Sequence, residues 1–374
     1  MAPHRHRPSL CALPAELRIL ILKSSHDGAS LKALVHASPA YHHAYTIDRR
    51  AIFSGVILNH LHRTYGDAHE FFLALHSTHM APDRHNPRER IIQFLSQYWS
   101  PDNAIDHTTL SIDDTIKLMR LEDTIRFLAR DFSAFVLEDC PASTDREIQY
   151  SASEMRRFAR AVLRWHIHAN LFGHRGVMAS ATLLEQPGPD FHIERFYSLF
   201  HTWEIEEMIS LHNYVIDRYY AIIRAYKMEH GRGRGSTSSV EVCNFVNGLF
   251  SLGPLDFAQA LRSPTWDFLW SLPGDSWDKT MGTFVAALPL EYYPYHARHP
   301  TEENRAWLAK KNQHFHGDDR VHGPNWGWIV GNKGKVEVYY ALRECRKFRR
   351  RGYVFWDKAR IERNQALLGG CDSL

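Results

Sequence analysis

Histidine is the residue type in this sequence that most readily suggests chemistry, because imidazole binds metal ions and transfers protons near neutral pH. The chain has 25 histidines among 374 residues. Zinc and similar ions need three or four ligands that converge on one point. One hypothesis is therefore a metal-dependent enzyme. The two candidate ligand groups are His166, His168 and His174, and His314, His316, Asp318, Asp319 and His322.

The spacing within these groups argues against a metal centre. In a helix, residues two positions apart point to different faces, so His166 and His168 could not chelate one ion together. Residues 314–322 would converge only in a loop, and the chain contains no His-Glu-x-x-His sequence. Most histidines are therefore interpreted as surface and boundary residues. We expect no bound metal and no cofactor.

Other motifs that would indicate catalysis are absent from the sequence. Residues 331–337 (GNKGKVE) lack the spacing of a phosphate-binding loop. No G-x-S-x-G, protein-kinase or C-x-x-C pattern occurs. The sequence therefore predicts a protein without enzymatic activity.

The composition is typical of a globular protein of the cell interior. Apolar residues make up 44% of the chain and the net charge is +3, which indicates neither disorder nor nucleic-acid binding. The five cysteines are dispersed, as is usual in a reducing compartment. No stretch approaches the roughly 20 apolar residues of a membrane span. We expect a cytoplasmic or nuclear protein that binds neither membrane nor nucleic acid.

Two features near the C-terminus have both functional and structural interpretations. Residues 343–363 contain nine Lys or Arg and three acidic residues, with aromatic residues between them. This stretch could bind an acidic protein or a phosphate. The favoured interpretation is a solvated helix face that leads into a buried aromatic strand. Cys371 matches a prenylation position, but the residues after it are polar, and the sequence leaves its lipidation open.

The elements that would position these residues are almost all helical, because apolar residues recur every three or four positions. Ser111 with Asp114, and Ser151 with Glu154, form capping-box patterns at two helix starts. Ser30 is a candidate cap of the second helix. Helices are predicted over residues 14–24, 31–37, 41–62, 67–77, 87–99, 112–137, 147–172, 203–228, 240–251, 254–262, 264–270, 301–312 and 357–367.

These elements predict an all-α fold with two parts. A small N-terminal module of three helices is expected over residues 10–62, and a larger α-helical body over residues 63–374. A flexible connector is expected near residues 231–239 (GRGRGSTSS). Residues 335–350 are predicted either to be helical or to begin as a strand (KVEVYY, residues 335–340), which leaves open a minor strand pair near the C-terminus.

The N-terminal module carries the most informative pattern. It reads Leu10-x-x-Leu13-Pro14-x-Glu16-Leu17-x-x-x-Ile21-Leu22, and then Ser30-Leu31-x-x-Leu34-Val35. A three-helix unit of this size cannot bury so many apolar residues, which favours an exposed apolar face. Such a face commonly docks in a partner's groove. The alternative is that this stretch is the first helical hairpin of one large domain.

This pattern resembles the F-box family. The resemblance implies a three-helix module that docks on a Skp-type adaptor protein of a cullin–RING ubiquitin ligase. The chain departs from the family at the third helix, where residues 38–50 (SPAYHHAYTIDRR) contain Tyr41 and Tyr45 in place of a tryptophan. This departure affects the expected affinity for the adaptor and not the expected fold.

A second resemblance covers more of the chain. Residues 157–173, 200–220 and 349–362 are similar to a group of fungal proteins in which a degenerate F-box precedes a long α-helical body. This resemblance concerns the architecture and says little about function, because similar folds serve different functions.

The sequence leads to a hypothesis of a non-enzymatic adaptor. It would dock on the Skp-type adaptor and cullin complex and recognise an unidentified target protein through the helical body. The alternative is a structural or interaction protein whose F-box-like unit packs internally and binds no ligase. The residues expected to form the adaptor-binding face are Leu13, Pro14, Leu17, Ile21, Leu31, Leu34 and Val35.

Overall fold

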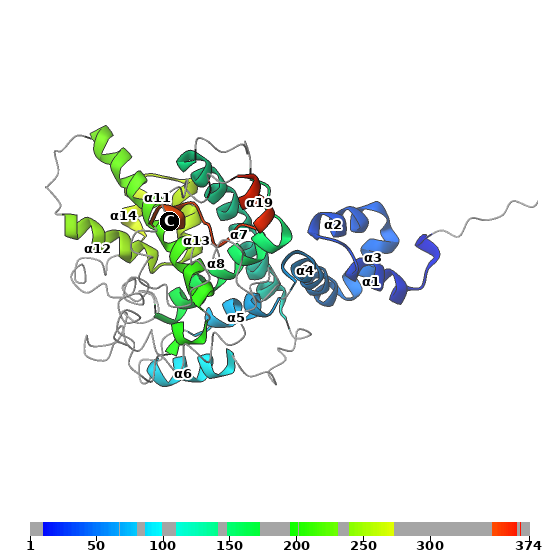
Figure 1. The fold of residues 1–374 in the computed structure, drawn as a ribbon. Coiled ribbons are helices and arrows are strands. Elements are labelled where there is room, and N and C mark those ends of the chain that lie inside the picture. Colours follow the sequence, from blue (N-terminus) through cyan, green and yellow to red (C-terminus); the bar gives the residue numbers. More distant parts are fainter. Residues whose placement is uncertain are drawn as a thin grey trace, which may run out of the picture. The chain divides into compact units, whose positions relative to one another are not determined.

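The computed structural model describes residues 10–66, 68–80, 87–98, 110–140, 148–172, 195–200, 202–230, 239–272, 346–364 and 367. Every regular element in these ranges is a helix (Figure 1), which confirms the predicted all-α fold. The predicted helix at 301–312 and residues 231–238 of the predicted connector lie outside the described residues. Of the stretch 335–350, residues 335–345 also lie outside them, and residues 346–350 form a helix. None of the described helices is long and apolar enough to cross a lipid bilayer.

The chain forms two compact units. Unit 1 comprises Met1–Leu75 and Asp102–Asp123, and unit 2 comprises His76–Pro101 and Thr124–Leu374. Unit 1 thus contains the predicted module and also later residues. Two helices, α5 and α7, contribute residues to both units. The elements of unit 1 are η1 (Leu10–Ala12), α1 (Ala15–Lys23), α2 (Gly28–Ala37), α3 (Pro39–Ile47), α4 (Arg49–Tyr65) and parts of α5 (His69–Ser77) and α7 (Ile112–Asp139).

The single helix predicted over residues 41–62 is wrong, because two helices meet at Asp48. The backbone of Asp48 is not helical, with φ −137° and ψ 48°. The Asp48 carboxylate instead pairs with the Lys23 ammonium group at 3.2 Å. The break allows α3 and α4 each to pack against α1.

The second helix begins earlier than predicted because Asp27, and not Ser30, is its cap. The Asp27 carboxylate accepts a hydrogen bond from the Ser30 backbone N–H at 2.7 Å, and α2 starts at Gly28. The core of unit 1 then forms between α1, α2, α3 and α4. Its buried residues are Leu22, Leu31, Val35, Tyr41, Ala44, Ile52 and Val56.

Unit 2 is built around α11 (Thr202–His230), which contacts α8, α12, α14 and α18. The sequence predicts one apolar stripe on this helix. In the structure, residues 203–212 are all buried, including three glutamates, because neighbours pack against α11 from several sides. The other elements are α6 (Pro87–Tyr98), the rest of α7, α8 (Ala152–Phe172), η3 (Tyr197–Leu199), α12 (Ser239–Phe250), α13 (Pro254–Arg262), α14 (Trp266–Ser271), α18 (Arg346–Arg350) and α19 (Lys358–Arg363).

Both predicted capping boxes are confirmed. At the start of α7, the backbone N–H of Asp114 donates to the Ser111 hydroxyl at 3.0 Å, and the Ser111 N–H donates to the Asp114 carboxylate at 3.2 Å. At the start of α8, the Ser151 N–H donates to the Glu154 carboxylate at 2.9 Å. The reciprocal bonds satisfy backbone groups that a helix start leaves unpaired.

Candidate docking surface

The first helix of unit 1 has an exposed apolar face. Leu17 is 46% exposed and Leu20 is 60% exposed. Because they are three positions apart in α1, they lie on the same face of the helix. Leu22 is fully buried in the core. Unit 1 therefore completes its core without Leu17 and Leu20, which leaves this apolar face available to a partner.

An open groove of about 660 Å³ adjoins this face between α1 and α2. Leu20 belongs to both the face and the groove. The Ser25 hydroxyl is buried and has no hydrogen-bond partner among the described residues. The groove combines apolar and polar side chains, as ligand-binding surfaces commonly do. The residues that line it are Leu20, Ile21, Ser24, Ser25, His26, Ser30, Ala33 and Leu34.

Five of the seven predicted adaptor-binding residues have exposed surface. Pro14 and Leu17 are exposed, and Leu13 is partly buried. Ile21 and Leu34 are also partly buried and line the groove. The structure therefore brings Ile21 and Leu34 together at one surface, although they are in different helices.

Leu31 and Val35 do not lie at this surface, which corrects their predicted place in the binding face. Both are buried in the core of unit 1. They are four positions apart, so α2 presents them together on its inward face. In this structure both side chains pack in the core of unit 1 and cannot contact a docked partner.

The predicted adaptor-binding set omits two exposed apolar residues of this region. Leu10 in η1 is 63% exposed and Leu20 is 60% exposed. Leu20 is one of the unspecified positions (x) between Leu17 and Ile21 in the F-box-like pattern. The three-residue spacing between Leu17 and Leu20 is the signal that could have identified Leu20.

Side-chain hydrogen bonds to α3 and α4 fix the position of α1 in unit 1. The Arg18 guanidinium donates to the Ala40 carbonyl of α3 at 2.8 Å. The Asn59 amide of α4 donates to the Lys23 carbonyl at 2.9 Å. Because α1 is fixed at both positions, its exposed side chains are presented on a preorganised surface.

A buried carboxylate connects α4 with the part of α7 that belongs to unit 1. Glu122 Oε1 lies 3.2 Å from His60 Nε2 and accepts a hydrogen bond from the Tyr65 hydroxyl, also at 3.2 Å. The His60 ring in turn makes an edge contact with His26, which lines the groove. These contacts satisfy a buried carboxylate and stabilise unit 1 next to the groove.

Three histidines of unit 2 are buried, which corrects their interpretation as surface or boundary residues. His166 and His168 occupy α8 and His212 occupies α11. Burial lowers the pKa of His166 to about 4. Burial, with a smaller effect of the nearby Arg349 guanidinium, lowers the pKa of His212 to about 4. The imidazoles of His166 and His212 are therefore neutral at pH 7.

These histidines lie among aromatic rings. His168 packs against Phe196 with ring centroids 5.3 Å apart, and His212 packs edge-on against Phe250 at 4.6 Å. Within the part of the chain that the structure describes, no three His, Cys, Asp or Glu side chains could hold a metal ion. His174 and residues 314–322 lie outside that part.

The basic stretch near the C-terminus is only in part the solvated helix face that was favoured. Lys358, Glu362 and Arg363 of α19 are exposed. Four other residues, Arg349, Arg350, Arg351 and Arg360, form ion pairs with carboxylates of unit 2. Residues 352–356 form turns and a bend and not a strand, and the side chains of residues 353–356 are buried. These four arginines are therefore engaged by carboxylates of the unit.

Comparisons with protein-family models, with curated proteins and with solved structures yield no match to this chain. The F-box resemblance therefore remains an expectation, and the function is inferred from the chain's own residues.

Proposed function

We propose that this protein is a non-enzymatic adaptor with separate roles for its two units. Unit 1 docks on a Skp-type adaptor of a cullin–RING ubiquitin ligase, and unit 2 recognises a target protein. The observation that carries the proposal is the exposed apolar face of Leu17 and Leu20 beside the groove between α1 and α2.

The energetics of such a surface fit a docking role. Burying a leucine side chain fully contributes about 1.5–3 kcal/mol. Leu17, Leu20 and the groove residues would together contribute several times that amount before the cost of association is subtracted. Unit 1 needs no reactive side chain for this role, because its contribution is the burial of apolar area.

The docking face can be tested with Leu17→Glu and Leu20→Glu combined in one chain. Both side chains are exposed, so the variant should fold normally. Burying two carboxylates against an apolar partner surface is unfavourable, and we expect binding to a purified Skp-type adaptor to weaken by roughly a hundredfold or more. Binding is measured by co-purification and by titration calorimetry.

The matched control carries Met228→Glu and Leu255→Glu, two exposed apolar residues of unit 2. This control should bind the adaptor as the wild type does. If the wild type shows no binding, or if the unit 1 variant binds as well as the wild type, the docking proposal is wrong. Absent binding would favour the alternative of an interaction protein that meets no ligase.

A further inference from the structure

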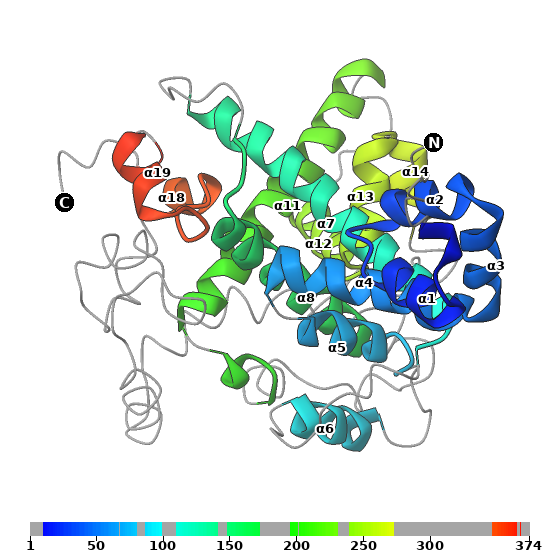
Figure 2. The ribbon, with the colours of Figure 1, turned by 90° about the vertical axis from the view of Figure 1, so that its right-hand side faces the viewer.

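Residues 346–364, named here the C-terminal segment, depend on unit 2 for their conformation. The segment contains the helices α18 and α19, which are red in Figure 2. They have five and six residues. Helices this short do not persist alone in water. Their turns are closed by internal backbone hydrogen bonds, such as the one from Gly352 N–H to the Arg349 carbonyl at 2.9 Å. The segment therefore folds by docking.

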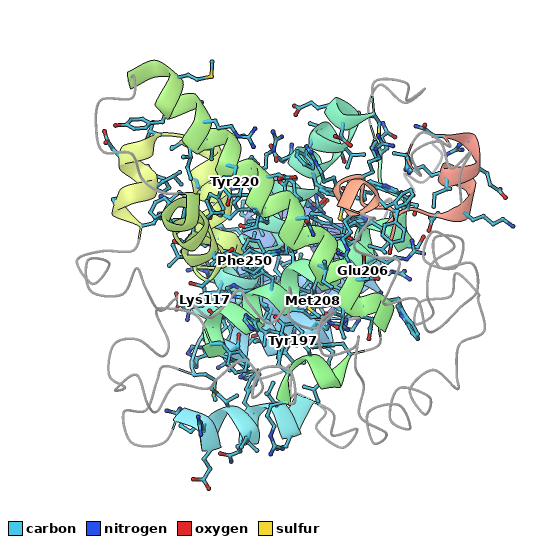
Figure 3. All side chains as sticks on the ribbon, turned by 60° about the vertical axis from the view of Figure 1, so that its left-hand side comes forward. Lys117, Tyr197, Glu206, Met208, Tyr220 and Phe250 are labelled. Atoms are coloured by element: carbon cyan, nitrogen blue, oxygen red, sulfur yellow. The ribbon has the colours of Figure 1, made fainter. Side chains whose placement is uncertain are left out.

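Two bidentate ion pairs fasten the segment to buried carboxylates. Arg349 pairs with Glu206 of α11 at 2.6 and 3.0 Å. Figure 3 labels Glu206 on α11. Arg360 pairs with Glu154 of α8 at 2.7 and 2.8 Å. Glu206 is 2% exposed and Glu154 is fully buried. A buried carboxylate is costly without a cation, so both glutamates require a guanidinium partner.

Two further arginines extend the same pattern. Arg350 pairs with Asp217 at 3.0 Å, and Arg351 pairs with Asp139 at 3.1 Å. Carboxylates from α7, α8 and α11 thus surround the segment. We name this surface the acidic slot and define it by Asp139, Glu154, Glu206 and Asp217.

In one contact the charges are reversed, because the segment supplies a carboxylate and α8 supplies the guanidinium. This contact fixes the alignment of the segment along unit 2. The Asp357 carboxylate lies at the start of α8, where the Ser151 and Ser153 hydroxyls donate to it. The Arg157 guanidinium of α8 also donates to it at 2.9 Å. An arginine at position 357 would meet Arg157, so a shifted register is disfavoured.

Aromatic side chains of the segment provide its apolar anchor. Phe355 and Trp356 are fully buried, with ring centroids 5.5 and 5.9 Å from that of Phe132 in α7. Tyr353 is also buried and donates a hydrogen bond to Glu206 at 3.1 Å. The slot therefore recognises arginines, aromatic residues and one aspartate in a set order.

We infer that the acidic slot is a peptide-binding site that the chain's own C-terminal segment occupies. The segment undocks as one unit, and the slot then accepts a peptide of the same chemistry from another protein. The paired charges gain little net free energy after desolvation. Ordering each segment residue costs conformational entropy, which offsets much of the gain from aromatic burial. This inference concerns unit 2 and is independent of adaptor docking by unit 1.

Hydrogen exchange of the full-length wild type tests whether the segment undocks. We expect the amides of residues 352–361 to exchange through a local opening, at least about tenfold faster than the slowest amides of α11. If the segment and α11 instead exchange at the same rate, through global unfolding alone, the inference is overturned.

A binding experiment tests whether the slot takes a peptide. The probe is a fluorescent peptide with the sequence of residues 346–364. The Arg360→Ala chain loses one bidentate pair and should open more often, so it should bind the probe roughly tenfold more tightly than the wild type. The control Lys358→Ala removes an exposed cation of the same segment and should bind as the wild type does.

A second probe defines the specificity. A peptide in which Arg349 and Arg360 are replaced by glutamate should not bind, because it would face Glu206 and Glu154 with like charge. If a folded Arg360→Ala chain binds neither peptide, or binds both equally, the slot is not a peptide-binding site. If that chain does not fold, the exchange rates of the wild type decide the question.

Discussion

Gly352 shows how one residue permits the docking of a whole segment. Its φ is 63°, in the left-handed region that residues with a side chain rarely adopt. A Cβ atom at this position would also collide with the Phe132 ring. The residue therefore allows both the turn and its close approach to α7.

We expect Gly352→Ala to lower the free energy of unfolding of unit 2 by about 2 kcal/mol or more, from backbone strain and the clash with Phe132. Gly55→Ala is the matched control, because Gly55 lies inside α4 and its added Cβ would make only ordinary contacts with Lys23. That change should stabilise unit 1 by about 0.5–1 kcal/mol. Urea unfolding of both variants measures the effects, and similar losses in the two would contradict this account.

At the scale of elements, local patterns predicted helix starts better than helix breaks. The caps of α7 and α8 depend on residues three positions apart, so the sequence contains all the information. The break at Asp48 coincides with the packing of α3 and α4 against α1, where the Asp48 carboxylate pairs with Lys23, 25 residues earlier. A pattern of neighbouring residues contains no information about such a distant contact.

The cap of α7 offers a test at this scale. Ser111→Ala removes the acceptor of the Asp114 N–H and should lower the stability of unit 1 by about 1 kcal/mol. Ser96→Ala is the control, because Ser96 is an exposed serine near the end of α6 whose hydroxyl bonds only locally. It should change the free energy of unfolding by less than about 0.5 kcal/mol. Thermal and urea unfolding compare the two, and equal effects would exclude a capping role.

At the scale of the whole molecule, the buried histidines should make unit 2 sensitive to acid. His166 and His212 have a pKa of about 4 in the folded chain, against 6.5 for an ordinary histidine. Between these values the unfolded chain binds more protons, so stability is full above pH 6.5 and falls as the pH decreases toward 4. At pH 5 each histidine should lower the free energy of unfolding by about 2 kcal/mol.

This pH dependence can be separated from that of other groups by comparing variants. His212→Gln should reduce the difference in unfolding free energy between pH 7 and pH 5 by about 2 kcal/mol, whatever its effect at pH 7. His62→Gln, a change at an exposed histidine of unit 1, should leave that difference unchanged. Urea unfolding at the two pH values measures it. If His212→Gln leaves the difference in unfolding free energy between pH 7 and pH 5 unaltered, His212 is not buried as a neutral residue.

The sequence by itself determined the helical class, most helix positions and the excess of apolar residues near the N-terminus. These properties depend on residue spacing within one helix, which a linear pattern records. Only the tertiary structure decided that Leu31 and Val35 are core while Leu20 is exposed. It also decided that the basic stretch near the C-terminus lies among carboxylates. The burial of a side chain depends on which distant helices pack around it, and ion pairs such as Arg349–Glu206 join residues far apart in the chain.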